Sequence, residues 1–435
     1  MNLWAAAIVA ALLVELGLRL VADWLNLRAL DSGVPVEFRD VYDPERYRRT
    51  QAYTRARTHF GIVTSVIDLA VLLAFWFAGG FGLLDRTLRA LGLGPIATGL
   101  LFFAALGLGQ QLVHLPARWW STFVIEERFG FNRTSRRTFW ADLARGALLA
   151  MVVGAPLLAA ILWLFARAGA HAWLYCFLAS TLFLVGLQYV APTWILPLFN
   201  RFEPLAEGEL KDAILSYARA VRFPVQGVFL IDGSRRSTKG NAFFTGFGRR
   251  RRIALFDTLV EQLGTSELVA VLAHEIGHAK RRHVLWGMAV AVAQLGVVFF
   301  LLSIALESRG LFAAFFVAEP SVHAGLVLFG LVLAPIELVL SIGLLALSRR
   351  HEREADEFAA RTIGSGAPLA SGLKRLSAES LSNLTPHPLH VLLHYSHPPL
   401  VARVRALAGA TAAAATDAER SPGAARRESP GAQAR

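Results

Sequence analysis

The chain has 435 residues, of which 55% are hydrophobic and only 17% are charged. Soluble domains carry about 25% charged residues, so this composition excludes a disordered protein and argues against an ordinary soluble enzyme. In a soluble protein, the net charge of +12 would indicate a nucleic-acid partner. Here the basic residues lie in loops between apolar runs, as in membrane proteins. We therefore expect contact with membrane lipids and no nucleic-acid partner.

Seven apolar runs approach the length of about 20 residues that crosses a bilayer. They cover residues 3–20, 60–84, 91–113, 147–165, 172–196, 284–306 and 324–348. The first run is the weakest because Glu15 and Arg19 interrupt it. It has no small-residue cleavage pattern, so we interpret it as a retained helix and not as a signal peptide. The single cysteine, Cys176, excludes a disulfide within the chain and a Cys-ligated structural zinc site.

Arginines alternate between rich and poor loops along the chain. The loops after the first, third and fifth runs and the C-terminal segment are rich in arginine, whereas the second, fourth and sixth loops hold few. The positive-inside rule then places the rich loops and the C-terminus in the cytoplasm and the N-terminus outside. Frequent arginine and alanine are typical of a GC-rich bacterial genome. We expect a bacterial inner membrane, or the endoplasmic reticulum membrane for a eukaryotic chain.

The polar segments divide the chain into five parts. Residues 1–198 hold the first five spans, 284–348 hold the last two, and the polar segments 199–283 and 349–410 lie on the cytoplasmic side. Strand-like stretches at 227–231 and 252–256 precede a helix, so we expect the two polar segments to form one small α+β domain. Residues 411–435 contain few apolar side chains to bury and are predicted to be disordered.

The sequence His274-Glu-Ile-Gly-His278 is an H-E-x-x-H motif. On a helix, positions i and i+4 share a face, so both imidazoles can bind one zinc ion while Glu275 takes a proton from the water beside it. Leu268, Leu272 and Ile276 support the helix, and we expect Thr265 or Ser266 to cap it. A random chain of this length and composition would contain roughly 0.02 such motifs by chance. The alternative is two surface histidines on an exposed helix.

A catalytic zinc site needs a third protein ligand and one open position. The segment directly after the last apolar run offers His351, Glu352 and Glu354, and spacing alone does not choose among them. Helical spacing puts Glu352 and Asp356 on one face. Glu352 could then bind the metal while Asp356 orients a histidine ligand.

A second group of histidines could by itself form a rival metal site. Prolines between these residues are expected to break any regular helix through the group. We therefore predict that one member points into the active site and that the group is not the principal metal site. The group consists of His387, His390, His394 and His397.

Residues 241–257 predict a hairpin beside the motif helix. An exposed edge strand near a metal could hold an extended peptide through main-chain hydrogen bonds; an ordinary core hairpin is the equal alternative. Glu15, Asp68 and Glu337 lie within the apolar runs. Ionisable groups at this depth usually face protein or water, so we expect a hydrated cavity between the helices.

The order of these motifs resembles the Ste24-type CAAX prenyl proteases, integral-membrane zinc metalloproteases of the M48 family. The H-E-x-G-H of that family matches residues 274–278, its E-x-x-A-D matches 352–356, and its H-Y-S-H-P-P with a downstream arginine matches 394–399 and Arg403. Further stretches also match, at residues 125–132, 197–205, 241–244 and 256–259.

The resemblance implies a mainly α-helical fold. In it, seven membrane helices form a barrel around a chamber, and a small cytoplasmic α+β zinc metalloprotease domain closes it. It implies one zinc ion per chain, with Glu352 as the third ligand. It further implies that His397 and Arg403 bind substrate or stabilise the reaction intermediate, and that Asn241 and Ala242 pair with the substrate backbone.

Three functions follow for comparison. The first is a zinc endopeptidase that cuts peptides near their C-terminus, as eukaryotic family members cut isoprenylated CAAX proteins; clearance of misfolded membrane proteins is its variant. The second is a membrane channel or carrier with a structural zinc, against which the intact Glu275 argues. The third, based on charge alone, is a nucleic-acid-associated membrane protein, which binding lost steeply with salt would reveal.

Overall fold

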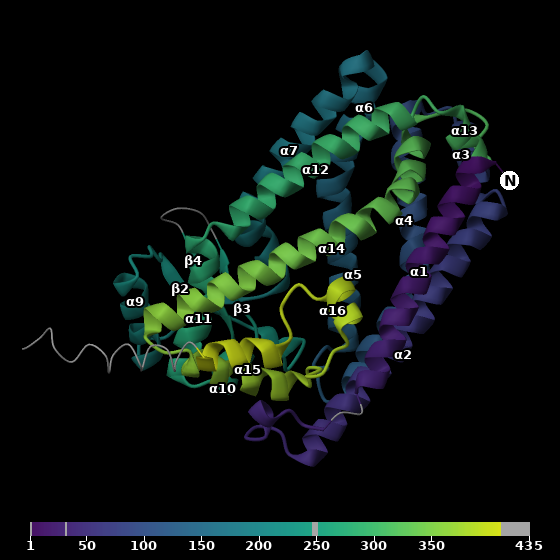
Figure 1. Ribbon diagram of the computed structural model, residues 1–435. Coiled ribbons are helices and arrows are strands. Elements are labelled where there is room, and N and C mark those ends of the chain that lie inside the picture. Colours follow the sequence, from purple (N-terminus) through teal and green to yellow (C-terminus); the bar gives the residue numbers. More distant parts are fainter. Residues whose placement is uncertain (1, 31–32, 246–250, 410–435) are drawn as a thin grey trace, which may run out of the picture.

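The computed structural model describes residues 2–30, 33–245 and 251–409 (Figure 1). The predicted disordered tail, 411–435, lies outside these ranges. Long helices form most of the molecule, and a small sheet with short helices lies at one end of them. Among the described residues, seven helices are long and apolar enough to cross a membrane, and each overlaps one predicted apolar run. The predicted number of spans is therefore confirmed.

Most of the membrane helices are longer than their apolar runs. They comprise α1 (Leu3–Ala29), α2 (Pro44–Phe77), α4 (Pro95–Trp120) with the π-helical segment Ser121–Glu126, α5 (Arg136–Leu149) continued through a π-helical segment into α6 (Ala155–Arg167), α7 (Ala172–Val190) continued similarly into α8 (Leu196–Phe199), α12 (His283–Ala305) and α14 (Val322–Ile363). Short helices α3 (Gly80–Arg89) and α13 (Arg309–Ala314) lie between spans. Large apolar side chains are exposed along these spans; Leu182 is 75% exposed and Val339 is 69% exposed. Such surface is stable only against lipid.

Helix α14 joins the last membrane span to the soluble part without a break. It runs from Val322 to Ile363, so its C-terminal third carries the polar segment after the last apolar run. This continuity fixes Glu352 and Asp356 rigidly relative to the membrane helices. Side chains on a continuous helix are held more precisely than side chains on a loop.

A four-stranded sheet has the strand order β1-β2-β4-β3. Strands β2 (Gly227–Ile231) and β4 (Arg252–Phe256) are parallel and have the bounds predicted from the sequence. Strands β1 (Phe202–Pro204) and β3 (Ala242–Thr245) pair with them in antiparallel fashion. The β3–β4 pair is the predicted hairpin. Residues Ile253 and Leu255 of β4 pack with Leu268 and Leu272 of the motif helix in one buried cluster.

The motif helix α11 (Thr265–Lys280) packs most extensively against α14 and α15 (Ala367–Ser380). Gly277 makes the contact with α14 possible, because a Cβ there would lie 3.1 Å from the Ala355 Cα. The small residue lets the two backbones approach and brings α11 level with Glu352. The soluble part also holds α9 (Glu209–Ala220), α10 (Asp257–Gln262) and α16 (Pro388–His394).

A cavity of about 950 Å³ lies among α1, α2, α3, α4 and α14. Leucines dominate its lining, but Glu15 and Asp68 also reach it. Glu15 pairs with Arg19 at 2.7 Å, and Asp68 Oδ1 lies 3.5 Å from His114 Nδ1. Two of the three carboxylates therefore line a cavity between the helices, as expected, whereas Glu337 is absent from its lining.

Candidate active site

The N-cap of helix α11 lies one residue before the first of the two residues expected to cap it. Gly264 is its N-cap, and the Gly264 N–H donates to a carboxylate oxygen of Glu267 at 2.9 Å. The prediction of Thr265 or Ser266 as the cap was therefore wrong. Glu267 also accepts a hydrogen bond from Ser371 at 2.5 Å and pairs with Arg375 at 3.1 Å, both on α15. The buried carboxylate thus fixes the start of the helix that carries the motif.

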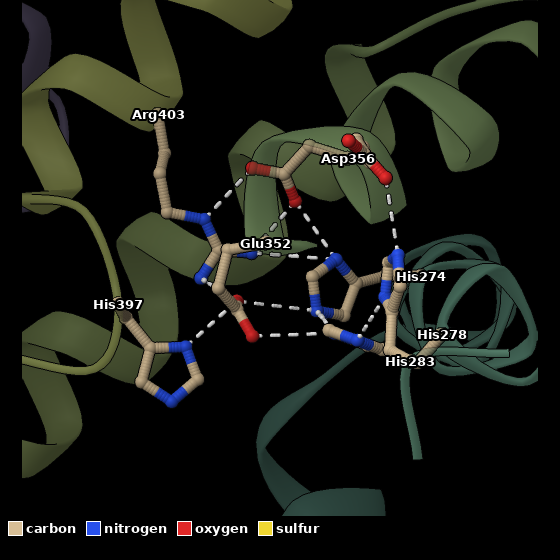
Figure 2. A network of polar contacts seen from close by, with 8 residues as sticks. His274, His278, His283, Glu352, Asp356, His397 and Arg403 are labelled. Carbon is tan, nitrogen blue, oxygen red and sulfur yellow. Dashed lines mark hydrogen bonds and ion pairs between the residues drawn. The ribbon is translucent and has the colours of Figure 1, made fainter. Parts of the chain in front are cut away.

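Three side chains converge between α11 and α14 (Figure 2). The Nε2 atoms of His274 and His278 are 3.2 Å apart; Glu352 Oε1 lies 3.2 Å from His278 Nε2, and Glu352 Oε2 lies 3.5 Å from His274 Nε2. The ligand atoms of a tetrahedral metal bound at about 2.0–2.1 Å are separated by about 3.3 Å. The triangle therefore has the size of a metal site.

The donor atoms also need a cation. Glu352 is 4% exposed, and its Oε2 atom has no hydrogen-bond partner of acceptable geometry among the described residues. His397 and Arg403 lie within ion-pair distance of this oxygen but make no hydrogen bond of good geometry with it, which leaves it open to a cation. Two imidazoles and one carboxylate form a donor set typical of a catalytic zinc site. The three residues thus fit a divalent metal ion.

Asp356 and Arg403 surround His274 on the side away from the triangle. Asp356 Oδ1 lies 2.8 Å from His274 Nδ1. Arg403 donates from Nη2 to Asp356 Oδ1 at 2.7 Å and from Nε to Asp356 Oδ2 at 2.8 Å. Arg403 Nη1 also lies 3.5 Å from Glu352 Oε2. The arginine is buried and donates two hydrogen bonds to Asp356, so it contacts both carboxylates of the site.

His283 occupies the equivalent place beside His278, a role that the sequence did not predict. Its Nδ1 atom lies 3.0 Å from His278 Nδ1, and its Nε2 atom lies 3.2 Å from Glu354 Oε2. The ring stacks on His351 with centroids 4.0 Å apart. The rival ligands His351 and Glu354 are therefore engaged with His283 and lie outside the triangle. His283 follows His278 by five positions and begins α12 after the left-handed residue Arg282, so helical spacing along α11 does not predict its place.

His397 approaches the triangle from the segment after α16. Its Nδ1 atom lies 2.7 Å from Glu352 Oε2, and the side chain is 61% exposed. The exposed part of the ring is accessible to a substrate in the adjoining cavity. His397 is thus the predicted member of the histidine group that points into the site.

Glu275 lies beside the triangle without a fixed partner. Its carboxylate makes no hydrogen bond or ion pair with any residue in the described part of the chain. Burial raises the pKa of Glu275, while the charges of His274 and His278 oppose this shift. A carboxylate with a raised pKa is a better proton acceptor from water than an ordinary surface glutamate.

Comparison with known proteins identifies the family. Residues 23–201 match the family described as CAAX prenyl protease N-terminal, five membrane helices, and residues 204–411 match peptidase family M48. The CAAX prenyl protease 1 homolog of Arabidopsis thaliana is 34% identical over 89% of this chain and 94% of its own length. CAAX prenyl protease 1 of Saccharomyces cerevisiae is 32% identical over 87% of this chain and 89% of its own. The chain belongs to peptidase family M48.

A solved structure extends this M48 membership to the fold. The crystal structure of S. mikatae Ste24p superposes with a TM-score of 0.88 and 31% identity, covering 94% of this chain and 99% of that one. The predicted family and the seven-helix fold with a small protease domain are confirmed. This M48 peptidase is a multi-pass integral membrane protein and a metallopeptidase acting on peptides or proteins. The channel and nucleic-acid alternatives receive no support.

Strand β3 of the M48 peptidase lies at the end of the described sheet and beside α11. The Phe256 N–H donates to the Asn241 carbonyl at 2.9 Å, so Asn241 faces β4. Alternation along an antiparallel pair then turns the main-chain groups of Ala242 away from β4. The Ala242 N–H is held instead by the Asn241 side-chain oxygen at 2.9 Å. The main-chain groups of Ala242 therefore lie on the outer edge of β3, where no strand of the described residues pairs with them.

A second cavity adjoins the triangle. Its volume is about 730 Å³, and its lining includes His397 and Arg403 together with residues of α1, α2 and α16. The cavity therefore connects the membrane helices with the candidate active site.

Proposed function

We propose that this protein is a zinc endopeptidase that cleaves CAAX-type protein substrates near their C-terminus at the cytoplasmic face of its membrane. The convergence of His274, His278 and Glu352 carries the proposal, because a His₂Glu donor set with one open position is that of zinc proteases. One zinc ion bound there would lower the pKa of a coordinated water and polarise the scissile carbonyl.

Side chains of the site carry out proton transfer, orient the metal ligands and bind the substrate. Glu275 accepts a proton from the attacking water and then returns it to the leaving amine, for which its raised pKa and lack of partners suit it. Asp356 holds His274 in the tautomer whose Nε2 is free for metal, and Arg403 holds Asp356. The exposed ring of His397 hydrogen-bonds the substrate beside Glu352.

The substrate backbone pairs with the outer edge of β3 at Ala242, after the Asn241 side chain that holds the Ala242 N–H turns away. Main-chain pairing orients an extended peptide without demanding a particular sequence. The relatives are named CAAX prenyl proteases, which supports lipidated CAAX proteins as substrates. The cavities of about 950 Å³ and 730 Å³ offer space for a lipid-bearing C-terminus. Recognition then involves both the peptide and the membrane.

The arginine-rich loops support the cytoplasmic placement. Arg46, at the start of α2, pairs with Glu379 of α15 at 3.3 Å. Asp142, in α5, pairs with Arg236 next to the sheet at 2.8 Å. Both basic loops thus contact the protease domain, and the positive-inside rule assigns such loops to the cytoplasm. The membrane we propose is a bacterial inner membrane.

The test is a Glu275→Gln variant of the full-length protein in liposomes, assayed by mass spectrometry on a farnesylated CAAX peptide and on the same peptide without the lipid. We expect zinc content to stay unchanged and cleavage to fall about 10²- to 10⁴-fold, because the general base is lost. Glu261→Gln, an exposed glutamate of α10, is the matched control. Full cleavage by the zinc-loaded Glu275→Gln variant would refute the assigned base, and equal cleavage of both peptides would refute a need for the lipid.

A further inference from the structure

The histidine group after α15 divides among three places. His397 approaches Glu352. His387 is the N-cap of α16, where its Nδ1 atom accepts the Leu389 N–H at 3.2 Å. Pro388 begins this helix and does not interrupt it, so the expectation that prolines prevent a helix here was wrong. As a result, His390 and His394 lie one turn apart on the same face of α16.

That face of α16 meets α1, and Asp23 lies opposite the two histidines (Figure 1 shows the two helices). The ligating atoms of Asp23, His390 and His394 all lie within 4.8 Å of one another. Asp23 Oδ1 is 3.2 Å from His390 Nδ1, and the two imidazole centroids are 4.7 Å apart. The shorter separation matches the about 3.3 Å expected between ligands of a tetrahedral metal. His394 is exposed, so its ring is free to adjust toward the other two ligands.

A second observation indicates a missing partner. The His390 Nδ1 atom is buried but makes no hydrogen bond of acceptable geometry with the described residues, although Asp23 is near. Buried polar atoms are almost always satisfied. A cation between the nitrogen and the carboxylate satisfies both at once.

The surroundings tolerate a cation. Arg19, one turn before Asp23 on α1, is neutralised by Glu15 at 2.7 Å. Tyr395 covers His390 with the edge of its ring, with centroids 5.6 Å apart. His390 and His394 line the cavity of about 730 Å³, so an ion and its water can enter.

We propose that Asp23, His390 and His394 form a second metal site, distinct from the catalytic triangle. Two imidazoles and one carboxylate select a divalent transition ion such as Zn²⁺ and disfavour Mg²⁺ and Ca²⁺, which prefer oxygen ligands. The bound ion joins α1 to α16. Because α16 leads directly to His397, occupancy of this site fixes the segment that delivers His397 to the active site.

The test counts metal equivalents in the full-length protein. Apo protein in detergent is titrated with Co²⁺, and bound metal is followed by its visible absorption and by elemental analysis. We expect two equivalents in the wild type and one in His394→Ala. Asp23→Asn, which preserves side-chain volume, should likewise bind one. His274→Ala should keep one equivalent, that of the second site, and His171→Ala, an exposed histidine outside both sites, should keep two.

Hydrogen exchange provides an independent measurement. Amides of residues 389–397 should exchange more slowly after the second equivalent binds, and this slowing should be absent in His394→Ala. One equivalent in the wild type, or two in both His394→Ala and Asp23→Asn, would overturn the second site. Neither result would affect the catalytic triangle, because the His274→Ala variant tests that site separately.

Discussion

The imidazole of His274 is held between Asp356 and the metal triangle: its Nδ1 atom lies 2.8 Å from Asp356 Oδ1, and its Nε2 atom lies 3.2 Å from His278 Nε2. One ring nitrogen is thereby committed to the carboxylate and the other to the metal position. The same arrangement recurs at His278, where His283 replaces the carboxylate.

Replacing Asp356 with asparagine should weaken zinc binding about 10- to 100-fold, since residues that orient metal ligands contribute on this scale. The amide keeps the shape but stabilises the wrong histidine tautomer and loses the charge that Arg403 pairs with. Zinc affinity measured by competition with a chelator checks this. Glu357→Gln on the exposed side of α14 is the control. Unchanged affinity in Asp356→Asn would show that Asp356 does not position His274.

His283→Ala should also lower zinc affinity, by about 10-fold or more, because His278 loses the group that fixes its ring. His351→Ala removes only the stacking partner of His283 and should change affinity much less. Chelator competition on both variants separates a role in orienting His278 from a general loss of packing. Equal losses in the two variants would contradict the assigned role of His283.

Zinc binding should release at least one proton at pH 7. Burial opposes the charged form of His274, but the Asp356 and Glu352 carboxylates overcome it and raise the pKa of His274 to about 9 in the metal-free protein. Below that pH the ring holds a proton that the metal must displace. Apparent affinity should therefore rise about tenfold per pH unit from pH 6.5 to 8 and level off above about 9. Calorimetry in buffers of different ionisation enthalpy measures the number of protons released. A zinc affinity independent of pH would contradict the raised pKa of His274.

Ala242→Pro should lower kcat/KM about tenfold, mainly through KM, because the edge strand loses one main-chain donor. Ala242→Gly keeps the N–H and is the matched control. Zinc content should be the same in both variants. If Ala242→Pro cleaves the peptide normally, the substrate does not pair with this edge.

Local patterns sufficed for much of the fold. The β-branched and apolar stretches at 227–231 and 252–256 predicted β2 and β4 with their bounds, and the apolar runs predicted all seven spans. The hydrogen bond from the Gly264 N–H to Glu267 also joins residues close in sequence. A glycine N-cap has no side chain, however, so the sequence does not indicate it. The cap was therefore predicted at the neighbouring Thr265 or Ser266, which have capping side chains.

Long-range partners were not accessible from spacing. Glu352 could be chosen over Glu354 only through the family resemblance, because both follow the last apolar run on the same helix. His283 was missed because Glu354, its partner, lies 71 positions away. Asp23 lies on the first membrane helix and meets His390 only once α1 and α16 pack together. Tertiary packing, not local sequence, creates these contacts.

The most direct measurement is a crystal structure of the zinc-loaded protein with diffraction recorded on both sides of the zinc absorption edge. The account predicts an anomalous peak about 2.0–2.2 Å from His274 Nε2, His278 Nε2 and Glu352, with one position open beside Glu275. A zinc-loaded, active protein without a peak between these three side chains would contradict it.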